Sequence, residues 1–171
     1  EADLLEEAAR ETGLEDFGAD DFRERLRVWL AALREDDNAT PVGRLGARRD
    51  ILRYLVARLR VEDVIRRNPA IPEEEIREPI IIVGLPRSGT THLVNLISAD
   101  HRLRSMPYWE SLEPVPIPGE GPGHDGRDPR YVRCRTSWDR QDAFMPLLKA
   151  MHPLTPEHVH EEIELQAIDF S

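Results

Sequence analysis

An apolar segment that runs directly into a glycine-containing loop constrains this chain more than any other feature. Residues 80–83 read Ile-Ile-Ile-Val, a β-branched run typical of a strand buried on both faces of a parallel sheet. Gly84 ends the run, and Leu93, Leu96 and Ile97 then recur at helical spacing within 90–99. The succession of strand, loop and helix predicts a βα unit. We therefore expect an α/β fold with a parallel sheet that begins at 80–83.

The loop between the expected strand and helix, residues 84–91, reads Gly-Leu-Pro-Arg-Ser-Gly-Thr-Thr. In this context successive backbone N–H groups and the positive end of the helix dipole face an anion, as in loops that bind phosphate. Gly84 and Gly89 remove Cβ atoms where the backbone must approach a ligand, and the Thr90 and Thr91 hydroxyls can add hydrogen bonds. The pattern favours an anion-binding loop over a tight turn without a ligand.

The loop also differs from the nucleoside-triphosphate P-loop, G-x-x-x-x-G-K-[ST]. Both glycines and the final hydroxyl residue match, but Thr90 stands at the lysine position. The cation within the loop is Arg87, and no later apolar strand ends in an aspartate that could hold magnesium. The sequence therefore favours a P-loop type fold with a reaction other than magnesium-dependent NTP chemistry.

The segment before this βα unit, residues 1–78, is predicted to be a helical N-terminal portion. An apolar stripe predicts a first helix with Asp20 as its N-cap; its members are Phe22, Leu26, Trp29, Leu30 and Leu33. A second long helix is expected from Thr40-Pro41 to Asn68-Pro69, with a stripe that starts at Leu45. Residues 71–75 are expected to form a short helical turn.

The second portion, residues 79–171, is predicted to be the start of a P-loop domain. Six prolines and four glycines lie within 107–129, which predicts a long loop without regular structure and a place for ligand recognition. Helical residues follow at 131–148 with an interruption at Pro146, and a final helix is expected to open at Thr155-Pro156.

Composition excludes several other classes of protein. The 171 residues carry a net charge of −10, which argues against a nucleic-acid partner, and no apolar stretch is long enough to predict a transmembrane segment. The single cysteine, Cys134, excludes an internal disulfide and predicts a buried structural thiol in a cytoplasmic protein. No metal site is expected. Because the chain begins at Glu1 and ends within a predicted helix, we expect it to be part of a longer protein.

Residues 79–91, with Pro107-Tyr-Trp-Glu110 after the helix, resemble the sulfotransferases that use 3′-phosphoadenosine-5′-phosphosulfate (PAPS), and most of all their bacterial branch in actinobacteria. Softer similarity extends to residues 12–18 and to the tail around His152 and Glu161. The resemblance implies a sulfotransferase fold and sulfuryl transfer from PAPS, without a metal, to a hydroxyl group. The expected acceptor is a small-molecule or glycolipid-like compound, and the expected product is adenosine 3′,5′-bisphosphate.

The resemblance also assigns roles to individual residues. It places a set of loop residues around the 5′-phosphosulfate: Pro86, Arg87, Ser88, Gly89, Thr90 and Thr91. Arg87, a permanent cation, suits neutralisation of charge on the leaving phosphate. Glu110 is the best match for the base that takes the proton of the acceptor, the alternative being a surface acid beside Trp109. His152 is a second catalytic candidate, with a structural role as its alternative. The residues that grip the 3′-phosphate are expected beyond Ser171.

Two other functional classes remain open at this point. A kinase or NTPase with a diverged P-loop would bind ATP in the presence of magnesium and would not recognise a 3′-phosphate. A non-enzymatic module that keeps the turn as a scaffold would bind neither nucleotide. The acceptor and the oligomeric state are not specified by the sequence.

Overall fold

The computed structural model describes residues 1–85, 87–151 and 155–171. The chain divides into two units, one of Glu1–Glu75 with Ile163–Ser171 and the other of Ile76–Glu162. Two predicted site residues, Pro86 and His152, lie outside the described residues. No helix in the described ranges has the length and apolar character that crossing a membrane requires.

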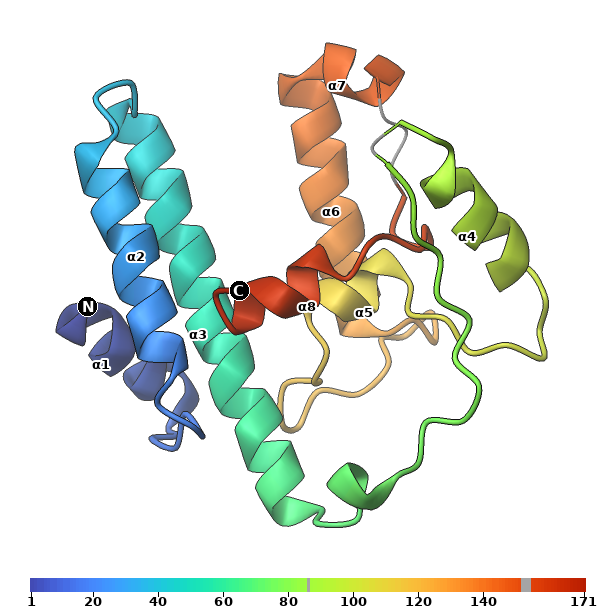
Figure 1. The fold of residues 1–171 in the computed structure, drawn as a ribbon, viewed down its shortest axis with the longest axis horizontal. Coiled ribbons are helices and arrows are strands. Elements are labelled where there is room, and N and C mark those ends of the chain that lie inside the picture. Colours follow the sequence, from blue (N-terminus) through green and yellow to red (C-terminus); the bar gives the residue numbers. More distant parts are fainter. Residues whose placement is uncertain (86, 152–154) are drawn as a thin grey trace. The chain divides into compact units, whose positions relative to one another are not determined.

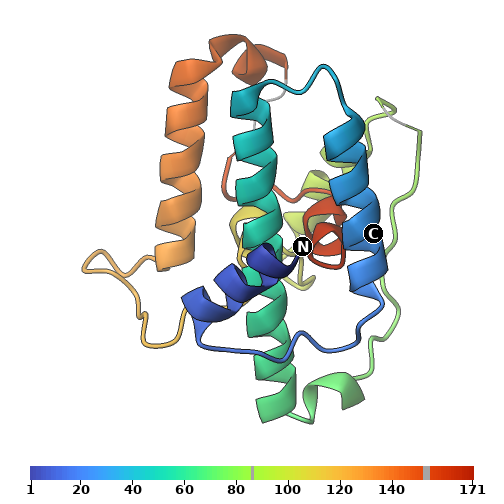
Figure 2. The same cartoon turned by 90° about the vertical axis from the view of Figure 1, so that its left-hand side faces the viewer.

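The first unit is helical. It contains α1 (Ala2–Thr12), α2 (Phe22–Glu35), α3 (Pro41–Arg67), a 3₁₀ turn at Ile71–Glu73 and α8 (Ile163–Ile168). Both α1 and α8 contact α3 (Figure 1), and Figure 2 shows α1 crossing α3. The last residues of the chain therefore belong with the N-terminal helices.

The bounds of α3 agree with the prediction, whereas the predicted start of α2 is one residue early. Thr40 caps α3 through its Oγ1, which accepts the Gly43 N–H at 3.0 Å, and Pro41 follows as the first helical residue. The N-cap of α2 is Asp21, and its side chain makes no capping hydrogen bond. Asp20 instead accepts a hydrogen bond from Arg23 Nε at 2.7 Å, so its carboxylate is engaged by the cation rather than by the helix amides.

The core of the first unit confirms the two predicted apolar stripes and adds a residue from the end of the chain. Its buried members include Phe22, Leu26, Ile51, Leu55, Leu59 and Phe170. The Phe170 ring lies 5.5 Å from Trp29 and 6.1 Å from Tyr54, both edge-on, so the tail completes an aromatic cluster. Leu45 is an exception, because its side chain is exposed instead of joining the stripe.

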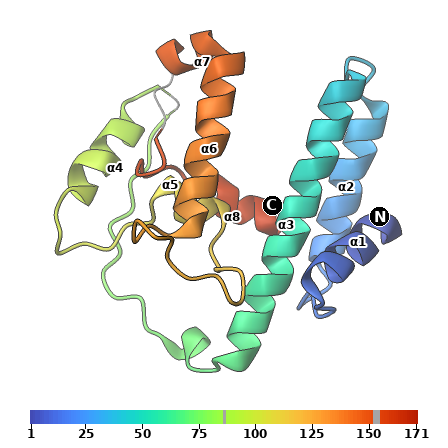
Figure 3. The ribbon, with the colours of Figure 1, turned by 180° about the vertical axis from the view of Figure 1, so that it is seen from behind.

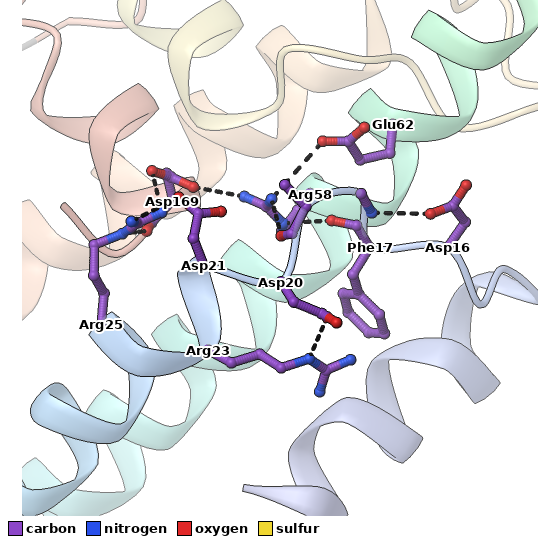
Figure 4. Close-up of polar contacts among 11 residues, drawn as sticks. Asp16, Phe17, Asp20, Asp21, Arg23, Arg25, Arg58, Glu62 and Asp169 are labelled. Atoms are coloured by element: carbon purple, nitrogen blue, oxygen red, sulfur yellow. Dashed lines mark hydrogen bonds and ion pairs between the residues drawn. The ribbon is translucent and has the colours of Figure 1, made fainter.

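A buried arginine joins three segments of this unit (Figure 4). Arg58 on α3 is 7% exposed, and its Nε donates to the Phe17 carbonyl at 2.7 Å. Its Nη2 donates to the Ala19 carbonyl at 3.1 Å, and its Nη1 donates to Asp169 Oδ1 at 2.7 Å. Arg25 Nη2 donates to the other carboxylate oxygen of Asp169 at 2.5 Å. The buried charge is thus paired and hydrogen-bonded, as burial of a charge requires.

The second unit holds α4 (Thr90–Ser98), α5 (Tyr108–Leu112), α6 (Pro129–Phe144) and α7 (Pro146–Met151), shown from behind in Figure 3. The predicted strand and parallel sheet are not confirmed. Residues 80–83 pair with no strand in the described ranges, and Ile81 and Val83 are 76% and 87% exposed. A strand of this kind needs a neighbour for its backbone groups and cover on both faces, and residues 80–83 have neither.

Two further predictions, for the proline-rich segment and for the final helix, are wrong. Residues 107–129 are not free of regular structure, because α5 begins directly after Pro107, whose carbonyl accepts the Glu110 N–H at 3.0 Å. The final helix begins at Ile163 and not at Thr155-Pro156. The Pro156 carbonyl accepts a hydrogen bond from the Trp109 backbone at 3.1 Å instead of one from its own segment. The break at Pro146, between α6 and α7, is as predicted.

Replacing Arg58 with methionine is expected to lower the free energy of unfolding by about 2 kcal/mol, because two backbone carbonyls and one carboxylate oxygen lose a charged donor. Urea unfolding followed by circular dichroism measures this. Arg49→Met is the control on the same helix, since the Arg49 side chain is 81% exposed and its substitution should change stability by less than about 0.5 kcal/mol. Equal effects would show that Arg58 does not hold the three segments together.

Candidate functional site

The predicted anion-binding loop turns sharply before α4. Arg87 has a φ of 65° and Gly89 a φ of 92°, both in the left-handed region. The Leu85 carbonyl accepts two hydrogen bonds from Ser88, one from the backbone N–H at 3.1 Å and one from Oγ at 2.5 Å. A positive φ is uncommon for a residue with a side chain, and strain of this kind gathers at ligand clamps.

Gly84 closes the loop against the start of α4. A Cβ at this position would lie 2.7 Å from Thr90 Cγ2 and 2.8 Å from Ser88 Oγ, so a larger residue would displace one of these two side chains. Gly89 is the N-cap residue of α4, and no side chain caps the helix there. The first amides of α4 are therefore left for a ligand or for water.

Arg87 is the cation of the loop. Its side chain is exposed, and it forms no ion pair or hydrogen bond with any other residue that the structure describes. Ser88 and Gly89 are also exposed, whereas Thr90 and Thr91 are half-buried at the start of α4. The described members of the predicted phosphosulfate set thus lie on the turn before α4 and on the first two residues of that helix.

Sequence reasoning missed a carboxylate at this loop. The Thr91 hydroxyl donates to Glu161 Oε1 at 2.9 Å, across 70 positions of sequence. We call residues 155–161 the strap, because they contact both α4 and the start of α5. The doublet Glu161-Glu162 in the tail was visible in the sequence, but no local pattern indicates that it meets the loop.

Asn95 fixes the strap to α4. Its Nδ2 donates to the Thr91 carbonyl at 2.7 Å and to the Val159 carbonyl at 2.8 Å. Its Oδ1 accepts the Val159 N–H at 2.9 Å. One carboxamide therefore satisfies both backbone groups of Val159 and orients the segment that carries Glu161.

The other side of the strap holds α5. Pro107 and Val159 form an antiparallel bridge, and the Tyr108 N–H donates to the His158 carbonyl at 2.8 Å. The rings of Tyr108 and His160 lie 4.6 Å apart. Because these contacts begin α5, the strap also sets the position of the segment that carries Glu110.

Glu110 is engaged by a cation. Its carboxylate accepts a hydrogen bond from Arg104 Nη2, and its side chain is 20% exposed. Among the described residues no hydrogen bond joins Glu110 to the loop at 84–91. Trp109 beside it lies under the Arg130 guanidinium, 4.7 Å from the ring centroid. Glu110 is thus a largely buried acid that is paired with an arginine.

The proline-rich segment is fastened to α6 by ion pairs. Arg133 Nε donates to Glu113 Oε1 at 2.9 Å, and its Nη1 donates to Glu120 Oε1 at 2.8 Å. The hydrogen bond to Glu113 is the main reason that the pKa of Arg133 is raised. Arg130 likewise lowers the pKa of Asp128, the N-cap of α6. This segment is held as an ordered loop over the helix.

Cys134 is confirmed as a buried thiol. It lies on α6, and burial raises its pKa to about 11. At neutral pH it is therefore protonated and a poor nucleophile. In the described ranges no group of three or more acidic, histidine or cysteine side chains is placed to hold a metal ion.

Residues 79–171 match the model of a family described as the Sulfotransferase family. The chain belongs to the sulfotransferase family. The match begins at the apolar run and includes the loop, α4, α5 and the strap. No curated protein matches the chain at a significant level of sequence similarity.

Two solved structures resemble this member of the sulfotransferase family. Sulfotransferase STF1 from Mycobacterium tuberculosis H37Rv is 27% identical, with a TM-score of 0.79 over 99% of this chain and 46% of that protein. Sulfotransferase STF9 from Mycobacterium avium is 26% identical, with a TM-score of 0.79 over 99% of this chain and 43% of that protein. The chain thus has a sulfotransferase-like fold and spans less than half the length of either protein.

Replacing Asn95 with alanine is expected to release the strap from α4, because Val159 loses the partners of both its backbone groups. Amide hydrogen exchange at Val159 should become at least about tenfold faster. Thr136→Ala is the control, since that hydroxyl donates to the Val132 carbonyl of its own helix. Unchanged exchange at Val159 in the Asn95 variant would contradict the proposed clamp.

Proposed function

We propose that this chain carries the donor-binding part of a sulfotransferase that moves the sulfuryl group of PAPS to a hydroxyl acceptor and releases adenosine 3′,5′-bisphosphate. The main support is Arg87, which is exposed on a strained turn and paired with no described residue, in a chain of the sulfotransferase family. An exposed, unpaired guanidinium beside uncapped helix amides suits an anion of high charge.

Sulfuryl transfer, like phosphoryl transfer, is an in-line displacement in which alignment and charge neutralisation dominate. The loop residues that would hold the 5′-phosphosulfate are Pro86, Arg87, Ser88, Gly89, Thr90 and Thr91. Arg87 would neutralise the charge that develops on the bridging oxygen of the leaving phosphate. No metal takes part in the step that we propose.

The acceptor needs a base for its hydroxyl proton, and we assign this role to Glu110, with His152 as the second candidate. The acceptor O–H bond breaks as its oxygen bonds to sulfur, the proton passes to the carboxylate, and the bisphosphate leaves with the S–O electron pair. The hydrogen bond from Arg104 Nη2 fixes the position of the Glu110 carboxylate. We expect a small-molecule or glycolipid-like acceptor and a cytoplasmic enzyme.

Replacing Arg87 with alanine should weaken binding of adenosine 3′,5′-bisphosphate at least about tenfold, since the loop loses its cation. Calorimetry without metal measures the dissociation constant. Arg102→Ala is the matched control, because Arg102 is an exposed arginine of the same unit that pairs with Asp100 at 2.5 Å. It should leave binding within about twofold.

The same titration separates the alternatives. Preference for ATP with magnesium over the bisphosphate would replace the sulfotransferase proposal with a diverged kinase or NTPase. Binding of neither nucleotide would leave a non-enzymatic scaffold.

Replacing Glu110 with glutamine is expected to lower kcat for sulfuryl transfer to a simple phenol by about 10²-fold or more, because the amide cannot take the proton. The dissociation constant of the bisphosphate should not change. Glu120→Gln serves as the control, since Glu120 binds Arg133 on α6. An unchanged kcat in the Glu110 variant would show that another residue is the base.

A further inference from the structure

A carboxylate stands where an anionic donor is expected to bind. Thr91 is the last residue of the predicted loop, and its hydroxyl donates a hydrogen bond to Glu161 Oε1 at 2.9 Å. We propose that Glu161 is a gate for the donor: it holds the Thr91 hydroxyl and must give it up when a phosphosulfate binds. This inference rests on the proposed function and deepens it by naming a residue that sets donor affinity.

The competition follows from the chemistry of the two groups. A threonine hydroxyl has one proton to donate, so a donor oxygen can receive it only after the carboxylate has left. The carboxylate and the donor are also both negative, and their repulsion is strong at hydrogen-bond distances. Glu161 therefore opposes binding of the anion that Arg87 attracts.

The local geometry keeps Glu161 in place and also gives it somewhere to go. The hydrogen bonds of Asn95 fix the strap at Val159, which lies two residues before Glu161 in the sequence. The Glu161 side chain is 49% exposed, so its carboxylate can turn toward water without being buried as a charge. Its other oxygen, Oε2, lies 3.7 Å from His160 Nδ1, a partner that could keep the displaced carboxylate near the loop.

The test is Glu161→Gln. The glutamine oxygen can still accept the Thr91 hydroxyl, so the loop keeps its shape while the negative charge is removed. Calorimetry with adenosine 3′,5′-bisphosphate, without metal, should show binding about fivefold tighter than that of the wild-type chain. Hydrogen exchange at the Val159 amide, unchanged in the variant, would show that the strap is still docked.

Glu162→Gln is the matched control, because it removes the same charge one residue further along the chain. It should tighten binding by less than about twofold. Thr91→Val tests whether the effect of Glu161 depends on the Thr91 hydroxyl. In a chain that carries Thr91→Val, Glu161→Gln should tighten binding of the bisphosphate less than it does in the wild-type chain, and a double-mutant cycle measures the difference. Equal gains in affinity from Glu161→Gln and Glu162→Gln would show that the effect comes from net charge alone, and would overturn the proposed gate.

Three other outcomes would also overturn it. If the bisphosphate binds and Arg87→Ala abolishes binding, but Glu161→Gln leaves affinity unchanged or weaker, the gate fails and the proposed function stands. If the wild-type chain and the Glu161→Gln variant both fail to bind the bisphosphate, the gate and the proposed function fail together. If ATP binds only with magnesium and Glu161→Gln abolishes this, Glu161 is a metal ligand beside the Thr91 hydroxyl, as in magnesium-nucleotide enzymes.

Discussion

The carboxamide of Asn95 sets the geometry on which the candidate site depends. It bonds the carbonyl of Thr91 on its own helix and both backbone groups of Val159, and so joins the helix after the loop to the strap. In the described part of the second unit no sheet ladder performs this task. The strap is joined to α4 by the hydrogen bonds of Asn95 and to the start of α5 by backbone hydrogen bonds. The placement of Glu161 against the loop follows from this clamp.

Local signals in the sequence predicted most of the helices, and long-range pairing accounts for what was missed. A cap and a proline give the start of α3 correctly, because capping chemistry acts within four residues. The loop at 84–91 was found for the same reason. The contacts of Arg58 with Asp169 and of Thr91 with Glu161 join residues far apart in sequence, and no periodicity encodes them. The apolar run at 80–83 gave the expectation of a strand, but strand formation also requires a neighbour.

The opposite charges of the loop have different origins. Arg87 is part of the turn itself, and its left-handed backbone conformation directs the chain before α4. Glu161 reaches the same turn only through the strap, and its carboxylate accepts the Thr91 hydroxyl. In the proposed site, the cation that attracts the donor is thus built into the turn, and the carboxylate that opposes it is docked by the strap. The sequence of the loop contains the cation and not the carboxylate.

The loop keeps its shape although the apolar run before it pairs with no strand in the described ranges. Its restraints lie within the turn and on the helix side: the Ser88 hydrogen bonds to Leu85, and the hydrogen bonds of Asn95 to Thr91 and Val159. None of these uses residues 80–83 as a paired strand. The turn is therefore held by α4 and the strap, and a sheet neighbour beside 80–83 would add cover for Ile81 and Val83 without having to form the turn.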